Sequence, residues 1–189
     1  MKMSVAAPIA LFLLLLLSCT NVKEKTGHQQ PAQRQLGQLA PDQQLIENIH
    51  FGMTSAAFFD YCRAMNARQL FTNSNGNQWV QFRSDTAFPA PVRWNFYPEF
   101  CEDRICKLNV LLSYEAYAPW NHRLVADSLL KDIIPVFNRW YGSGRYRSIR
   151  AHGIFKLIKI DGNRQINFWK LNEKDIQVVY TDLSVASNQ

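Results

Sequence analysis

The sequence predicts an α+β domain built from two helix-plus-three-strand units in tandem, forming an antiparallel sheet with both helices packed on one face. Two stretches repeat apolar residues at three- and four-residue steps, and each precedes three runs in which apolar and polar residues alternate. Such an order is explained by an internal duplication with halves 46–115 and 119–184. A coincidental succession of helical and strand segments is the alternative.

The first unit opens with a helix that begins at Ser55, where Thr54 can cap its free amides. Phe58 and Met65 lie on its apolar face, and we expect it to end between residues 67 and 70. A polar loop follows at 72–77. The three predicted strands of this unit are 78–83, 92–97 and 104–114.

A second, more strongly amphipathic helix of about twenty residues follows Pro119, with Asn121 as its cap. Pro135 lies inside it and predicts a kink or break near 131–134, because proline removes one hydrogen bond and crowds the preceding turn. Gly142 and Gly144 end the helix. The last three predicted strands are 145–160, bent at Gly153, then 164–171 and 175–182, with a hairpin turn at 161–163.

The N-terminus has the pattern of an export signal. Lys2 precedes an aliphatic run at 9–17 that is short for a membrane span, and the run ends in Leu16-Leu17-Ser18-Cys19. This sequence resembles the bacterial lipobox, which implies removal of residues 1–18 and attachment of lipid, palmitate included, to Cys19. A plain secretory signal and an uncleaved anchor are the alternatives.

Residues 19–45 are rich in glutamine and poor in aliphatic side chains, which predicts a flexible tether ahead of a folded domain at 46–184 and a tail at 185–189. A coil of this length spans roughly 25 to 30 Å. Thr20 stands where lipoproteins retained in the inner membrane commonly carry aspartate, so the resemblance implies an outer-membrane protein facing the periplasm. Without Lys2 the formal net charge falls from +6 to +5, which suits a neighbouring anionic lipid surface.

Apart from Cys19, the chain has three cysteines. Cys101 and Cys106 are spaced so that they can face each other across a hairpin loop, which predicts a disulfide in an oxidising compartment, with two unpaired thiols as the alternative. Cys62 falls on the apolar face of the first helix, where it is most simply a small buried hydrophobe.

The sequence contains no motif that predicts catalysis, a metal site or a cofactor. Its four histidines are scattered singly, and it has no GxSxG, Walker-type or GxGxxG motif. We therefore expect a protein that is not an enzyme and has no cofactor, although an envelope enzyme without a recognisable motif remains an alternative.

A basic run follows the second helix, with no acidic residue before Asp161: Arg145, Arg147, Arg150, Lys156 and Lys159. In a cytoplasmic protein this pattern suggests nucleic-acid binding, but export of the chain excludes that partner. Contact with an anionic lipid surface or an acidic partner is the functional interpretation. The alternative is a set of solvated side chains on a strand.

The stretch Phe51-Gly52-Met53-Thr54, which opens the first helix, resembles the start of small outer-membrane lipoproteins of the SmpA/OmlA family. The repeated helix-then-sheet order resembles the tandem fold of β-lactamase inhibitor protein. These resemblances imply a binding or accessory module of the cell envelope that is held to membrane lipid through Cys19 and recognises an unknown envelope protein or component. A structural or stress-response lipoprotein is the other non-catalytic alternative.

Overall fold

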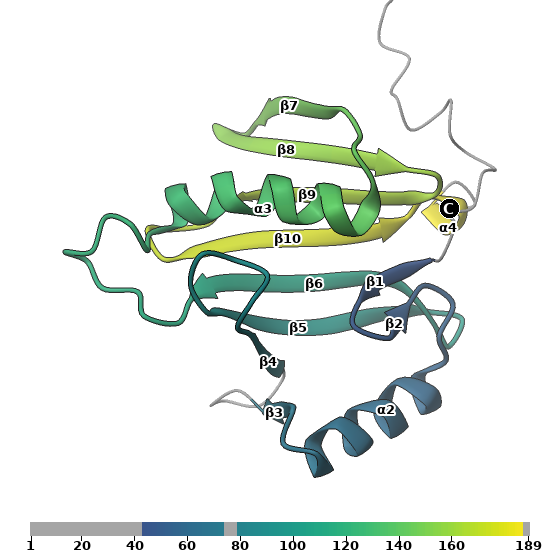
Figure 1. Ribbon diagram of the computed structural model, residues 1–189. Coiled ribbons are helices and arrows are strands. Elements are labelled where there is room, and N and C mark those ends of the chain that lie inside the picture. The colour runs from purple at the N-terminus through teal and green to yellow at the C-terminus, as the bar shows by residue number, and fades with distance from the viewer. Residues whose placement is uncertain (1–42, 74–78, 187–189) are drawn as a thin grey trace, which may run out of the picture.

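The computed structural model describes residues 43–73 and 79–186, which fold around one eight-stranded antiparallel sheet (Figure 1). The strands run across the sheet in the order β3-β4-β5-β6-β10-β9-β8-β7. In chain order they are β3 (Phe71–Asn73), β4 (Val80–Ser84), β5 (Val92–Cys101), β6 (Arg104–Tyr114), β7 (Tyr146–Ala151), β8 (Ile154–Asp161), β9 (Arg164–Lys170) and β10 (Asp175–Asp182).

Three helices and one small hairpin complete the described part of the chain. The helices are α2 (Ser55–Ala67), α3 (Ala126–Tyr141) and the short α4 (Leu183–Ala186), and the hairpin pairs β1 (Gln44–Ile46) with β2 (Ile49–His50). Within the described ranges, no helix is long and apolar enough to cross a membrane. The predicted signal segment, Cys19 and nearly all of the predicted tether lie outside these ranges.

The predicted fold class of two helix-plus-three-strand units is wrong, because the protein is mostly β and each long helix precedes four strands. Strand β3 forms at 71–73, where the sequence predicted the start of a polar loop after the helix end at 67–70. Only Phe71 of its side chains is buried, so it lacks an alternating signal. The predicted bent strand at 145–160 is two strands. His152 and Gly153 adopt positive φ angles of 51° and 79° and reverse the chain between β7 and β8.

Helix α2 begins where the sequence predicted. The Thr54 hydroxyl oxygen accepts a hydrogen bond from the Ala57 amide at 3.2 Å, which satisfies one of the free donors of the first turn. Phe58 and Met65 are its buried residues. Tyr61 packs edge-on against Phe71 of β3, which ties the helix to the edge of the sheet.

Helix α3 begins later than predicted and is not broken by its proline. Its N-cap is Val125, whereas the Asn121 side chain accepts a hydrogen bond from the Arg123 amide in the preceding turns. Pro135 is exposed and the helix continues to Tyr141. We attribute this continuity to tertiary packing, because the buried stripe on both sides of the proline holds the helix against the sheet: Ala126, Leu129, Ile133, Val136, Phe137 and Tyr141.

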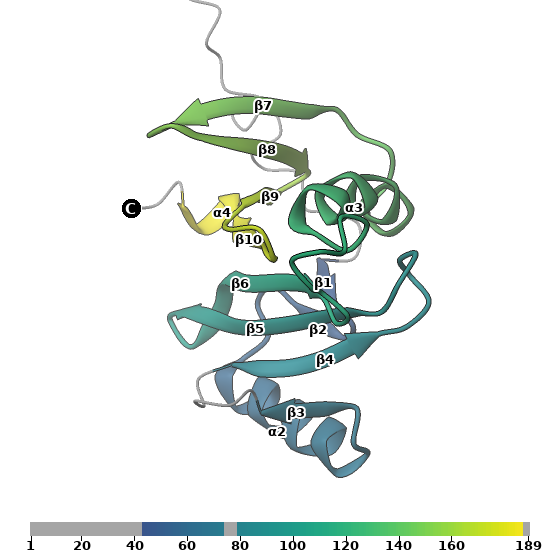
Figure 2. The same cartoon turned by 90° about the vertical axis from the view of Figure 1, so that its left-hand side faces the viewer.

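A chain of aromatic contacts on one face of the sheet, which we call the helical face, connects α3, which covers this face, with α2, which lies at the β3–β4 edge (Figure 1). Phe71 contacts Phe82 of β4, Phe82 stacks on Trp94 of β5, and Trp94 contacts Trp140 of α3 at 5.6 Å between ring centroids. Viewed along the sheet, α3 lies to one side of the strands (Figure 2). The side chains that alternate with this core point to the opposite face.

Candidate functional site

The opposite face of the sheet, here called the open face, carries a row of side chains that runs across strands β3, β4, β5, β6, β10 and β9. The strand register aligns them in the order Thr72, Gln81, Asn95, Leu111, Gln177 and Trp169. Every one of these side chains except the exposed Thr72 is partly buried. Carboxamides, an indole ring and one leucine therefore form a mixed polar and apolar surface in place of a second hydrophobic layer.

Hydrogen bonds hold the amides of this row in place. The Gln81 side-chain nitrogen donates to the Asn95 side-chain oxygen at 3.0 Å, and the Thr72 hydroxyl lies 3.5 Å from the Gln81 side-chain oxygen. On β10, the Gln177 side-chain nitrogen donates to the Val110 carbonyl at 3.2 Å. Amides fixed in this way can offer their remaining donors and acceptors to a partner at little further cost in side-chain entropy.

A shallow depression of about 420 Å³ lies at one end of this row. It is lined by Asn73, Gln81, Arg93, Asn95, Leu111, Ser113, Lys174 and Asp175. Arg93 is partly neutralised by Glu115, at 3.6 Å. The depression therefore combines donors and acceptors of both charge signs around one apolar side chain, as hydrogen-bonded recognition of a polar surface requires.

A second row of the open face runs parallel to the first, through Tyr97, Asn109, Val179, Asn167 and Ile158. The Tyr97 side chain is 40% exposed. The Asn167 side-chain oxygen is buried and accepts no hydrogen bond from the described residues.

At the edge of this row, hydrogen bonds from Lys107 and Asn109 lower the pKa of the Glu99 carboxyl, so this acid is ionised at neutral pH.

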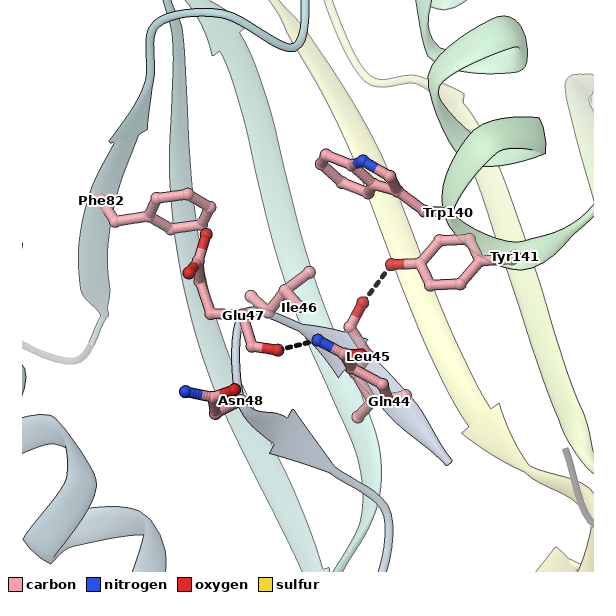
Figure 3. A pocket seen from close by; sticks show the side chains of 8 residues that line it. All are labelled: Gln44, Leu45, Ile46, Glu47, Asn48, Phe82, Trp140 and Tyr141. Carbon is pink, nitrogen blue, oxygen red and sulfur yellow. Dashed lines mark hydrogen bonds between the residues drawn. The ribbon is translucent and has the colours of Figure 1, made fainter. Parts of the chain in front are cut away.

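On the helical side, a separate pocket of about 350 Å³ opens between the β1–β2 hairpin and the end of α3 (Figure 3). Phe82 and Trp140 stand on either side of it, and the Glu47 carboxylate and the amide of Asn48 come from the hairpin. At its base, the Tyr141 hydroxyl donates to the Leu45 carbonyl. These groups can bind a small ligand, but they pair no nucleophile with a base.

Beneath this pocket lies a buried polar cluster. Arg164 is 1% exposed, its guanidinium stacks on the Tyr141 ring at 4.4 Å, and it donates to the Gln44 carbonyl and, at 2.5 Å, to Asp161. The Tyr141 and Tyr180 hydroxyls are 3.0 Å apart, and burial raises the pKa of Tyr180. These contacts fasten β1 to the C-terminal half of the sheet, so the cluster has a structural role.

The structure separates the five residues of the basic run. Arg145, Arg147 and Arg150 are exposed on or beside β7, and Lys156 lies on β8 with its ammonium 4.2 Å from the centroid of the Trp169 ring. Lys159 points inward, is 2% exposed and donates to the Tyr141 carbonyl at 3.2 Å. Lys159 must therefore be removed from the predicted anionic-surface contact, because an alternating strand turns this position into the core.

The cysteines do not form a reactive site. Cys101 and Cys106 are joined by a disulfide that closes the end of the β5–β6 hairpin. Cys62 is the free cysteine of the described residues, and burial raises the pKa of its thiol to about 11. A thiol with this pKa carries little thiolate at neutral pH and is a poor nucleophile. No cluster of potential metal ligands occurs in the described ranges.

No protein family model, curated protein or solved structure matches this chain. The lipobox and the likeness to the SmpA/OmlA family consequently remain predictions from the sequence.

Sequence reasoning identified the alternation of several strands but missed the open face as a site. The sequence shows Arg93 and Asn95 alternating with the apolar Trp94 and Phe96 along the predicted strand. The alignment of Asn95 with Gln177 and Trp169 depends on the pairing of β6 with β10, whose paired residues lie more than sixty positions apart. Asparagine and glutamine at outward positions of the alternating strands, such as Gln81 and Asn95, were the available signal.

Proposed function

We propose that this chain is a lipid-anchored binding module of the cell envelope that recognises a protein partner through the open face of its sheet. The membrane attachment rests on the lipobox-like sequence at residues 16–19 and on the glutamine-rich tether. The recognition role rests on one observation, the ordered row of amide and aromatic side chains across the open face. Neither part of the proposal requires catalysis.

The composition of the open face favours a protein partner. Reversible protein interfaces combine polar groups with aromatic anchors, and tyrosine and tryptophan are common among the residues that contribute most to binding. Tyr97 and Trp169 occupy separate positions on this face, with amides and aliphatic side chains between them. An open surface with only a shallow depression suits a folded partner better than a small molecule, which prefers an enclosed pocket.

The anchor is tested by metabolic labelling of the full-length chain with a palmitate analogue. We expect the wild-type protein to carry the label and Cys19→Ala to lose it, because the substitution removes the thiol needed for the thioether bond. Cys62→Ala serves as the matched control and should keep the label. Label that persists in Cys19→Ala would contradict lipidation at this site.

The recognition role is tested by in-cell photo-crosslinking from Gln177, at the centre of the open face, followed by mass spectrometry. A probe at Lys131, which is exposed on α3, is the matched control on the opposite side. We expect a discrete envelope protein to be captured from Gln177 and not from Lys131. The additional substitution Asn95→Arg should reduce this capture at least tenfold, because one misplaced charge in an interface costs several kcal/mol.

Equal capture from both positions, or repeated failure to capture a protein from Gln177 in cells that retain the anchored chain, would contradict recognition through the open face. Turnover of an envelope substrate that is lost in Glu47→Gln would instead favour the enzyme alternative at the pocket of Figure 3.

A further inference from the structure

The β7–β8 hairpin forms the outer edge of the sheet, on the side away from α2 (Figures 1 and 2). Only β8 pairs with β7 among the described strands, so the other side of β7 has no neighbouring strand. Its turn at His152 and Gly153 is exposed. The hairpin is therefore an exposed edge of the sheet.

The charge of this hairpin is strongly one-sided. Arg145, Arg147, Arg150 and Lys156 carry positive charge, and residues 142–160 contain no acidic side chain. None of these four cations forms an ion pair with any described residue, whereas Arg93 and Lys107 elsewhere in the sheet have carboxylate partners. The hairpin thus offers positive charge that the fold itself does not neutralise.

Large apolar side chains are exposed beside these charges. Ile154 and Phe155, directly after the turn, are 42% and 49% exposed, and Ile149 is 37% exposed. The register places Ile149 opposite Lys156 on the open face and Phe155 opposite Arg150 on the helical face. Apolar side chains therefore project from both faces of the hairpin, next to cations on both faces.

We propose that the β7–β8 hairpin binds the surface of an anionic phospholipid bilayer. The arginines contact the headgroup phosphates while Ile154 and Phe155 enter the interfacial region, as basic amphipathic elements do at membranes. A protein docked on one face of the sheet would leave one of these two apolar side chains in water. Immersion of the tip in a bilayer covers both.

This contact is separate from the lipid at Cys19 and lies at the β7–β8 edge of the open face, where Lys156 contacts Trp169 of the proposed recognition row. It gives the anchored domain a second point of attachment on the edge strand of the sheet, which lies beside the open face. The hairpin would then limit the orientations that a flexible tether leaves available, so that the open face meets its partner in a restricted set of poses.

The test places an environment-sensitive fluorophore at Ile154→Cys in a full chain that also carries Cys62→Ala. The protein is reconstituted into vesicles of phosphatidylcholine alone or of phosphatidylcholine mixed with phosphatidylglycerol. A lipid on Cys19 retains the chain and blocks that thiol from labelling. An unlipidated chain is retained by the uncleaved apolar segment and then also carries Cys19→Ala, so that position 154 alone takes the fluorophore. Flotation confirms attachment. We expect a blue shift with the anionic vesicles that is absent with phosphatidylcholine alone and is lost at high salt.

Substitution of Arg147 and Arg150 by glutamine should reduce the fraction of inserted hairpin about fivefold per charge removed. The same fluorophore at Lys131→Cys, on the exposed side of α3, should show no shift. An attached protein without a blue shift at position 154, or an equal shift in both vesicle types, would overturn the proposal. Crosslinking of the hairpin to an envelope protein, without any response to vesicles, would also overturn it by assigning this edge to a protein partner.

Discussion

Replacing Trp94 by alanine is expected to lower the free energy of unfolding by about 3 to 5 kcal/mol, which is a large part of the stability of a typical domain. Trp94 is 0% exposed and stacks on Phe82 at 5.3 Å. It also contacts Phe88 and Trp140, so it joins the sheet to α3. Alanine would leave a cavity among rings that cannot collapse into it. Urea denaturation followed by circular dichroism measures the loss.

Two variants show whether the cavity is the cause. Trp94→Phe should cost much less than Trp94→Ala, because it keeps most of the ring volume and removes an indole N–H that has no acceptor among the described residues. Trp120→Ala should change stability by no more than about 0.5 kcal/mol, because Trp120 is 81% exposed. Equal losses at positions 94 and 120 would contradict the assignment of Trp94 to the core.

The sequence predicts the longer alternating strands well because each has one face in the core. Val92, Trp94 and Phe96 are buried and their neighbours are partly or fully exposed, so periodicity and burial agree. The same reasoning places Cys101 and Cys106 across one hairpin, where the structure forms their disulfide. A local pattern suffices when the interaction itself is local.

The remaining features depend on contacts that no local pattern contains. β3 is three residues long and exists through its pairing with β4, and β7 is mostly exposed, so neither shows the alternation of a half-buried strand. The sequence prediction omitted β3 and joined β7 and β8 into one strand. It therefore gave six strands where the sheet has eight, and its fold class was wrong. Pro135 failed to break α3 for a related reason, since packing on both sides of it outweighs the lost hydrogen bond.

The candidate site also depends on contacts between distant parts of the chain, which no local sequence pattern predicts. Gln81 and Asn95 are neighbours within one meander, but Gln177 and Trp169 join their row only through long-range strand pairing. The sequence also grouped Lys159 with the exposed arginines, because proximity along the chain does not reveal which face of a strand a residue occupies. Burial lowers the pKa of the Lys159 ammonium, a shift that a fully solvated surface lysine does not show.

Replacing Arg164 by alanine is the second change with a large expected effect, a loss of about 3 kcal/mol in the free energy of unfolding. The substitution removes a buried cation and leaves Asp161, whose side chain is 28% exposed, and the Gln44 carbonyl without this donor. It also removes the guanidinium from the Tyr141 ring. Because Asp161 keeps some contact with water, we expect the lower end of the range for broken buried ion pairs.

Arg83→Ala is the matched control. Arg83 and Asp85 are also 2.5 Å apart, but their side chains are 55% and 59% exposed, so the pair should contribute only about 0 to 1 kcal/mol. Arg164→Lys keeps the charge and loses the planar, forked donor that reaches both oxygens and stacks on tyrosine, so it should restore only part of the stability.

Amide hydrogen exchange distinguishes a local effect from a global one. Arg164 holds the Gln44 carbonyl and Tyr141 holds the Leu45 carbonyl, so the β1–β2 hairpin should open first in Arg164→Ala and its amides should exchange faster than those of β6 and β10. The pocket of Figure 3 would lose one wall with this hairpin, because Leu45, Ile46 and Glu47 line it. Unchanged protection of Ile46 in Arg164→Ala would show that the Tyr141 hydrogen bond and the apolar contacts hold the hairpin without Arg164.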